Sequence, residues 1–398
     1  MGYEIERRDD DTMVLNMGPS HPAMHGTIRM VVRLAGETIE DANVEIGFLH
    51  RGFEKMAESF KYQQVIPLTD RLNYVSPIIN NVGYVMAVEK LLGIVDKLPE
   101  RNQYIRVIMS EISRVVDHLT CLGAMVMEVG AQTAFFYFMT AREFLYQVIE
   151  HVTGARVTTS YTRIGGLRSD LPENFEAMTE EALQKTEEVL EEIHGLFDRN
   201  RIFIDRTRNV GVISPEDAIS YGFTGPLLRA TGVPYDVRKA HPYLVYDKMD
   251  FEIPVGDNGD NFDRYIVRML EMEQSIKIIR QAIRELPEGP INIDSSDVVL
   301  PAKEDVYNSI EGTIKHFKLI FEGIKPPKGE AYFSVEGGNG ELGFYVVSDG
   351  TENPLKVRVR PPSFVHMAAV KDLIVGHMLP DIIPVFGSIN MIGGECDR

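Results

Sequence analysis

The stretch IRVIMSEISRVVDHLTCL, residues 105–122, decides the fold that we expect for this chain of 398 residues. Its apolar residues recur every three or four positions, which is the spacing of a helix with one buried face; they are Ile105, Ile108, Ile112, Val115, Val116, Leu119 and Leu122. Asp117 and His118 lie within the same helix. The stretch therefore predicts a long core helix that carries titratable side chains.

The next segment, residues 119–141, contains one charged residue, Glu128, and its length suggests a membrane-spanning helix. Gly123, Gly130 and Gln132, together with Glu128, divide it into pieces too short to span a bilayer. We therefore expect core helices of a large soluble fold around a buried carboxyl group, which needs a partner.

Helical spacing recurs along most of the chain. One helix is predicted to begin close to Pro77, which places Tyr74 on an exposed rim at its mouth. A short helix starts at Ser214, with Pro in its first turn, and stops near Gly222. The other predicted helices cover residues 173–200, 262–286 and 306–321.

Alternating apolar and polar residues predict small antiparallel sheets near both ends, over residues 27–34 and 38–46 and over residues 332–336, 341–348 and 355–360. The expected fold class is therefore α+β and predominantly helical. We expect residues 1–60 to form the first sheet with a histidine loop, residues 61–290 the helical core, and residues 291–398 an α/β region with a hairpin, all in one compact unit.

Composition narrows the classes of function. A formal net charge of −18 argues against nucleic acid and anionic lipid as partners, because both are bound through an excess of Lys and Arg. Cys121 and Cys396 are the only cysteines, so this chain can build neither a disulfide framework nor a cysteine-held iron–sulfur cluster. The same scarcity of cysteines favours a reducing compartment. The N-terminus lacks an apolar signal region, so we expect no targeting to a membrane or to export.

The loop GPSHPAMHG, residues 18–26, holds two histidines four residues apart. Pro22 keeps His21 out of a helical conformation, so His21 and His25 cannot share a helix face as they do in helical zinc sites. No Cys or acidic pair nearby completes a metal site. The histidines therefore stabilise the turn, bind a metal, or deliver a proton near neutral pH.

Ordered blocks give the chain a resemblance to a known family. The blocks GPSHPAMHG, GFLHRGFEK, DRLNYVS, RVIMSEISRVVDHL, GAQTAFFYF, YTRIGGLRSDLP, VSDG and GHMLPDI follow one another across nearly the whole chain. Together they resemble the D subunit of the proton-pumping NADH:quinone oxidoreductases, complex I. Any single block is a weak signal, but the blocks occur in the same order as in that family, and this order makes the resemblance specific.

That family is related to the large subunit of nickel–iron hydrogenases, in which an RGxE motif precedes two pairs of cysteine ligands. RGFE at residues 51–54 fits the motif. The first pair of positions holds Asn73 and Ser76, and the second pair holds Ile392 and Glu395. Because four thiolates are missing, no nickel–iron centre can be bound, and hydrogenase activity is excluded.

The resemblance implies a fold like the hydrogenase large subunit, with a quinone cavity at the contact with a partner that carries a 4Fe-4S cluster. His25 and Tyr74 match the residues that bind the quinone headgroup. Glu128 matches the acid that is paired with this histidine, although the family has Asp there. Arg51 matches an arginine beside the cluster, and His118 matches a histidine whose protonation follows cluster reduction.

The resemblance also implies the setting. The expected partners are a cluster-bearing B-type subunit, a C-type subunit and a membrane-arm subunit at the quinone entrance, on the cytoplasmic side of the bacterial inner membrane. Quinone is the expected substrate, NAD is used elsewhere in the complex, and this chain holds no metal or cluster. The expected activity is quinone reduction coupled to proton translocation. The alternative is a non-catalytic scaffold that kept the hydrogenase shape, which would not require His25, Tyr74 and Arg51.

Overall fold

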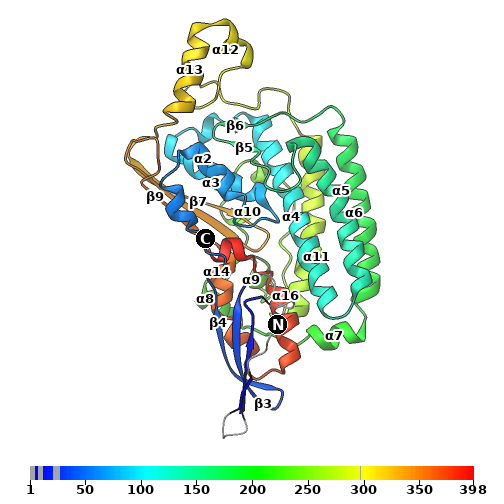
Figure 1. Ribbon diagram of the computed structural model, residues 1–398. Helices are drawn as coiled ribbons and strands as arrows, with labels where there is room; N and C mark the ends of the chain where they lie inside the picture. The colour runs from blue at the N-terminus through cyan, green and yellow to red at the C-terminus, as the bar shows by residue number, and fades with distance from the viewer. Residues whose placement is uncertain (1–4, 8–11, 21–26, 296) are drawn as a thin grey trace.

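Four long helices form the core of the protein (Figure 1). In the computed structural model, which describes residues 5–7, 12–20, 27–295 and 297–398, these helices are α4 (Glu100–Glu128), α5 (Gln132–Thr153), α6 (Phe175–Phe197) and α11 (Asn261–Arg284). Helix α4 packs against α5 and α11, and α6 packs against the same two helices. The long core helix predicted from residues 105–122 is thus confirmed, and it extends further at each end.

The apolar segment 119–141 is broken as expected. Helix α4 ends at Glu128 and α5 begins at Gln132, with Gly130 at a positive φ of 98° between them. Within the part of the chain that the structure describes, no helix is long and apolar enough to cross a membrane.

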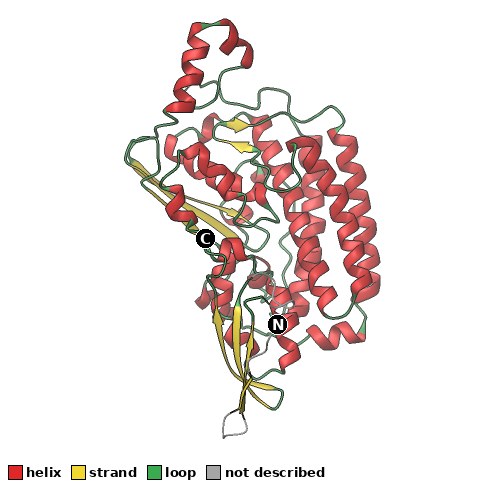
Figure 2. Cartoon of the chain, in the orientation of Figure 1, coloured by secondary structure: helices red, strands yellow, loops and turns green. Residues whose placement is uncertain are grey.

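A three-stranded antiparallel sheet packs against helix α3 (Pro77–Leu92) (Figure 2). Nearly every residue of α3 is buried. The strands of the sheet are β7 (Gly329–Glu336), β8 (Glu341–Ser348) and β9 (Lys356–Arg360), in that order. The predicted start of a helix at Pro77 and the predicted hairpin are therefore confirmed. The turn between β7 and β8 reaches the core helices, which matters for the site below.

The N-terminal sheet has the order β1-β2-β3-β4, all antiparallel. Its strands are β1 (Ile5–Arg7), β2 (Thr12–Met17), β3 (Arg29–Ala35) and β4 (Thr38–Glu45). The sequence predicts β3 and β4 but not β1 and β2. The sheet packs on a second hydrophobic core that it shares with residues from the C-terminal helices, so the two ends of the chain are built together.

Shorter elements connect these layers. The helices are α1 (Phe53–Ala57), α2 (Tyr62–Thr69), α7 (Arg201–Thr207), α8 (Pro215–Tyr221), α9 (Gly225–Arg229), α10 (Val237–Ala240), α14 (Pro362–Ala368), α15 (Val370–Ile374), α16 (Ile382–Ile389) and α17 (Gly393–Cys396). A small hairpin joins β5 (Thr162–Arg163) to β6 (Gly166–Leu167), and single turns of 3-10 helix cover Val95–Lys97, Tyr246–Lys248 and Leu379–Asp381.

The helix predicted over residues 306–321 is in fact two, α12 (Lys303–Asn308) and α13 (Ile310–Phe321), which project from one end of the molecule (Figure 1). Ser309 separates them because its side chain caps α13 by accepting from the Gly312 N–H. Most of the apolar residues that suggested a buried face are exposed. Helical spacing shows which residues share a face, but not whether the chain itself covers that face.

Candidate active site

The segments that hold the two replaced cysteine pairs lie against each other. Gly394 in α17 packs on the loop before α3, so closely that a Cβ there would stand 2.4 Å from the Arg71 carbonyl oxygen and 3.4 Å from the Tyr74 ring. Only glycine fits this approach. The C-terminal segment therefore supports the loop that presents Tyr74.

Asp117 of α4 lies where these segments meet. Its Oδ2 accepts hydrogen bonds from Asn73 Nδ2 at 2.8 Å and Ser76 Oγ at 2.7 Å, and its Oδ1 accepts from Asn390 Nδ2 at 3.0 Å. Asn73 and Ser76 thus donate hydrogen bonds to a carboxylate at positions where a hydrogenase would have thiolates. Sequence reasoning placed Asp117 on the helix but gave it no role.

Asn390 ends α16 in the left-handed conformation, with φ of 55°. Asn and Asp tolerate this backbone better than other side chains with a Cβ. The Asn390 amide also donates to Asn339 Oδ1 at 2.7 Å, so it joins Asp117 to the turn after β7. An Asp at this position would place a second carboxylate against Asp117.

Glu395 is a second buried carboxyl group in this cluster. Its Oε1 accepts hydrogen bonds from the Ser363 hydroxyl and from the Ser363 N–H, the latter at 3.3 Å. Burial and the negative charge of Asp117 raise the pKa of Glu395 to about 7. A carboxyl group with such a pKa can hold or release a proton near neutral pH.

Tyr74 lies at the mouth of a cavity of about 150 Å³, with 40% of its surface exposed. The predicted exposed rim is confirmed. Burial and the negative charges of Asp117 and Glu395 raise the pKa of the Tyr74 phenol. The hydroxyl therefore keeps its proton at neutral pH and is available as a hydrogen-bond or proton donor. The cavity is lined by Tyr74, Val75, Thr120, Cys121, Ala124, Gly387, Asn390, Met391 and Ile392.

Glu128, the last residue of α4, lies behind the wall of the same cavity. A Cβ on Gly387, which lines the cavity, would stand 2.7 Å from Glu128 Oε2. The structure therefore brings Tyr74 and Glu128 to one cavity from two elements. His25 lies outside the described residues, and its predicted contact with Glu128 stays a prediction.

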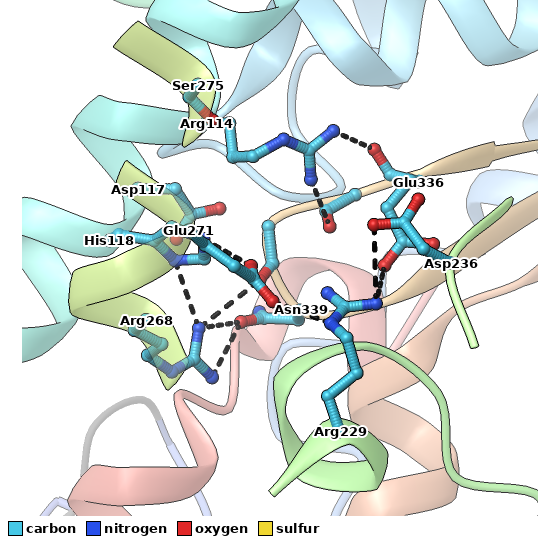
Figure 3. A network of polar contacts seen from close by, with 12 residues as sticks. Arg114, Asp117, His118, Arg229, Asp236, Arg268, Glu271, Ser275, Glu336 and Asn339 are labelled. Atoms are coloured by element: carbon cyan, nitrogen blue, oxygen red, sulfur yellow. Dashed lines mark hydrogen bonds and ion pairs between the residues drawn. The ribbon is translucent and has the colours of Figure 1, made fainter. Parts of the chain in front are cut away.

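His118 is fully buried between α4 and α11 (Figure 3). Its Nε2 lies 2.9 Å from Glu271 Oε2, and its Nδ1 lies 3.3 Å from Nη1 of Arg268. Arg268 can only donate, so Nδ1 accepts and the ring proton sits on Nε2, facing Glu271. Burial lowers the pKa of His118, the Glu271 carboxylate opposes that shift, and Arg268 adds to it. The arrangement holds a neutral imidazole.

An extended network of buried ion pairs continues from Glu271 (Figure 3). Arg229 Nε donates to Glu271 Oε1 at 2.6 Å, and Arg229 Nη1 donates to Glu336 Oε1 at 2.9 Å. Asp236 also lies 3.7 Å from this guanidinium. Although burial disfavours the charged carboxylates, the arginines hold the pKa of Glu271 well below its usual range and that of Asp236 at about 2.

Sequence reasoning missed this network, although it held a signal. Glu111 and Arg114 lie among the regularly spaced apolar residues of α4, and both are fully buried. Arg114 donates to the carbonyl oxygens of Glu336 and Gly337, at 2.7 and 2.8 Å, and so fastens the β7–β8 turn to α4. Charged residues inside an otherwise apolar helix predict buried partners, but not which ones.

Arg51 lies near Tyr74 in the chain's outer layer. Its exposed guanidinium donates to the Arg71 carbonyl oxygen at 2.8 Å, on the loop that leads to Tyr74. The segment before it is held by the C-terminus, because Asp397 accepts from the N–H groups of Gly47 and Leu49 at 2.9 and 2.8 Å. Arg51 and Tyr74 thus share one end of the site.

The site residues fall into two groups. Tyr74 and Glu128 flank the cavity, and Arg51 joins the same loop, whereas His118 lies deeper, linked to the cavity through Arg268, Asn339, Asn390 and Asp117. Within the described ranges, no three His, Cys, Asp or Glu residues are grouped so that they could hold a metal ion.

The family model of the 49 Kd subunit of respiratory-chain NADH dehydrogenase matches residues 128–398. The chain belongs to this family. It is 55% identical to a D subunit of the NADH-quinone oxidoreductase of Sorangium cellulosum, over 98% of this chain and 96% of the relative. It is 53% identical to the D subunit of the same enzyme in Pelobacter propionicus, with the same two shares. The D subunit of Methylacidiphilum infernorum is 48% identical over 99% of this chain and 96% of the relative.

Membership in the 49 Kd family confirms the resemblance and the fold class predicted from the ordered blocks. It also confirms that the chain is a subunit of an oxidoreductase complex of the respiratory chain, and it implies partner subunits. The positions that the sequence assigned to the quinone and the cluster remain predictions, to be supported by geometry.

Proposed function

We propose that this chain forms one wall of a quinone-reducing cavity in NADH-quinone oxidoreductase, beside a B-type subunit that carries a 4Fe-4S cluster. The observation that carries the proposal is the cavity between Tyr74 and the wall that Glu128 supports. At about 150 Å³ it is smaller than the roughly 300–1,000 Å³ of complete ligand pockets. A partner subunit and the His25 loop would supply the missing walls.

Reduction of a quinone to a quinol takes two electrons and two protons. In this proposal the electrons come from the partner's cluster, one after the other, and the protons come from donors beside the two carbonyl oxygens. The Tyr74 hydroxyl is one donor, because its raised pKa keeps it protonated until the quinone oxygens gain charge. His25 is the other, and Glu128 would balance its imidazolium charge and be left unpaired after the proton is delivered. Rearrangement of that charge would couple the reaction to proton translocation.

The substitution Tyr74→Phe in the assembled complex tests the role of the hydroxyl. Loss of a positioned proton donor lowers turnover by roughly 10²–10⁴-fold. We expect slower reduction of a soluble quinone analogue, with electron transfer to the cluster intact. Tyr221→Phe, an exposed tyrosine on α8, is the control and should keep full activity. Unchanged turnover and unchanged quinone affinity in Tyr74→Phe would reject the assignment and favour the scaffold alternative.

For Arg51 we propose an electrostatic role, in which an exposed cation beside the Tyr74 loop favours the reduced state of the partner's cluster. Its exposure and its hydrogen bond to the Arg71 carbonyl support this role. Redox titration of an Arg51→Met complex should show a lower cluster potential. An unchanged potential together with an unchanged cluster spectrum would remove the claim.

His118 would act on the cluster only through other groups, because its side chain is fully buried within this chain. Uptake of a proton on Nδ1 requires the Arg268 guanidinium, now 3.3 Å away, to turn aside. The proposed protonation of His118 on cluster reduction is therefore a rearrangement of the His118–Arg268 pair. A His118→Gln complex whose cluster potential keeps the wild-type dependence on pH would contradict it.

A further inference from the structure

A cavity larger than the one at Tyr74 lies at the end of the molecule that carries α12 and α13. It has a volume of about 550 Å³, within the range of complete binding sites. Four segments form its walls: the start of α2, the β5–β6 hairpin, the loop around residues 292–300, and α13. The lining residues are Lys61, Gln63, Gln64, Arg163, Ile164, Leu167, Arg168, Asn292, Val298, Val299, Leu300, Leu319 and Ile320.

The charges in this cavity have one sign. Lys61, Arg163 and Arg168 line it, and no Asp or Glu does among the described residues. None of the three forms an ion pair within the described part of the chain: Lys61 donates to the Ile320 carbonyl oxygen at 3.1 Å, and Arg168 donates to the Thr153 carbonyl oxygen at 3.2 Å. In a chain with a net charge of −18, a cavity lined by three cations and no described acid is a local exception.

Arg163 gives the strongest indication that an anion binds in this cavity. It is half-buried on the β5–β6 hairpin, and its guanidinium has no hydrogen-bond partner among the described residues. Burial and the neighbouring Arg168 lower its pKa, and the carboxylate of Asp70, which already accepts from Ser160 and Asn81, only partly opposes them. Burying a cation without a counter-charge is costly, so an anion from outside would relieve it.

The surface beside the cavity is apolar. On α13 the side chains of Ile310, Ile314, Phe317 and Phe321 are exposed, and the last two rings stack with centroids 4.3 Å apart. Such a contiguous apolar patch on a helix that projects into solvent marks an interaction surface. Leu300 and Ile320 line the cavity and are themselves half-exposed, so the patch and the cavity join.

We propose that this cavity and the outer face of α13 bind an extended segment of another subunit of the complex, one that carries acidic side chains interleaved with large apolar ones. The carboxylates would pair with Arg163 and Arg168, and the apolar side chains would cover Phe317 and Phe321. Charge complementarity decides between occupants. The net charge of −18 makes this chain repel both a second copy of itself and an anionic membrane, whereas a short acidic segment can pair with the cations of the cavity.

Helices α12 and α13, which flank this cavity, lie at the opposite end of the molecule from the N-terminal sheet (Figure 1). The site therefore does not depend on the proposed quinone chemistry. It would give this chain a second contact surface within the complex. That surface binds through charges and apolar side chains and takes no part in the quinone reaction.

A photo-crosslinking amino acid in place of Leu300, in the assembled and purified complex, tests the proposal. We expect one crosslinked peptide from another subunit, identified by mass spectrometry, that contains Asp or Glu next to large apolar residues. A crosslinker in place of Ile202, an exposed apolar residue on α7, is the control for non-specific reaction. A peptide without acidic residues, a peptide of this chain, a crosslinked lipid, or no crosslink would each overturn the proposal.

Charge reversal gives a second, independent measurement. Arg168 is exposed, so Arg168→Glu leaves the fold intact, and we expect the yield of the crosslink to fall by about tenfold. Reversal of the acidic residue found in the crosslinked peptide should restore the yield. A yield that stays at the wild-type level, or a loss that the paired reversal fails to rescue, would show that charge does not hold the segment. Quinone turnover of Tyr74→Phe is measured separately, so the failure of one proposal leaves the other standing.

Discussion

Arg229 and Arg163 are both withdrawn from solvent, yet their surroundings differ in a way that separates the inside of the protein from its contacts. Arg229 is fully buried and meets Glu271, Glu336 and Asp236, at 2.6, 2.9 and 3.7 Å. Arg163 is half-buried and meets no carboxylate at ion-pair distance among the described residues. A cation whose counter-charges belong to its own chain serves that chain's structure, whereas a cation without one points to a counter-charge from elsewhere.

The same contrast holds for apolar side chains. Around Arg229 the facing sides of α4 and α11 are buried against each other, and hydrogen bonds from Arg114 fasten the β7–β8 turn to α4. Around Arg163 the helix α13 leaves its apolar face in solvent. The buried ion-pair network behind the cavity at Tyr74 therefore finds its partners within this chain. The surface around Arg163, where another subunit would bind, does not do so among the described residues.

The largest expected effect is the loss of Arg229. Arg229→Met leaves three buried carboxylates with less positive charge, and breaking such a pair costs about 3–5 kcal/mol. Arg163→Met, by contrast, should change the unfolding free energy of the isolated chain by less than about 1 kcal/mol, because no internal acid loses a partner. Urea unfolding of the purified chain measures both. Arg201→Met, at a side chain that is 92% exposed, is the neutral reference. Equal losses of unfolding free energy for Arg229→Met and Arg163→Met would contradict the difference between the two arginines.

Glu395 is a buried acid without a cationic partner among the described residues, and it extends the comparison from arginines to carboxyl groups. Burial and the charge of Asp117 raise its pKa from 4.5 to about 7. At this group the folded state binds more protons than the unfolded state, so the contribution of Glu395 to stability is fully present below pH 4.5 and is lost as the pH rises through 7. The shift corresponds to roughly 3 kcal/mol. Glu395→Gln should remove this part of the pH dependence and be the more stable protein at about pH 8. Parallel stability curves for the two proteins would contradict the assignment.

Asn390→Asp tests how the same cluster tolerates one more carboxyl group. The new side chain would lose the donor that now reaches Asp117 Oδ1 at 3.0 Å and would face that carboxylate instead. We expect a loss of about 1–3 kcal/mol at about pH 8 and a smaller loss at about pH 5, because protonation relieves the repulsion. Comparison of urea midpoints at the two pH values measures it. A loss that does not depend on pH would point to the lost hydrogen-bond donor alone and not to repulsion between two carboxylates.

The sequence predicts the parts of this structure that depend on local patterns. Helix α4, the start of α3 at Pro77 and the β7–β8 hairpin follow from periodicity and from Pro and Gly positions. Tyr74 and Glu128 were found through a family resemblance, and the structure places both at one cavity. The helices and the hairpin are readable because each is determined within one stretch of chain, whereas the cavity joins residues from distant stretches.

Pairings between distant stretches could not be predicted. The contact of Asn390 with Asp117 joins residues 273 positions apart, and that of Arg229 with Glu336 joins residues 107 apart. No spacing rule connects such residues. Nor does the sequence show what covers the apolar face of residues 306–321, because the periodicity of α13 is the same whether the chain or a partner covers it.

The smallest expected effect lies on that face. Ile314 of α13 is 49% exposed, whereas Leu319 on the same helix is 8% exposed and lines the large cavity. Ile314→Ser should change the unfolding free energy of the isolated chain by less than about 0.5 kcal/mol, and Leu319→Ala should cost about 2–5 kcal/mol. In the assembled complex Ile314→Ser should weaken the contact that the Leu300 crosslinker reports. A large loss of stability from Ile314→Ser in the isolated chain would mean that α13 is already covered by its own chain, and the distinction between an internally complete core and an incomplete surface would fail there.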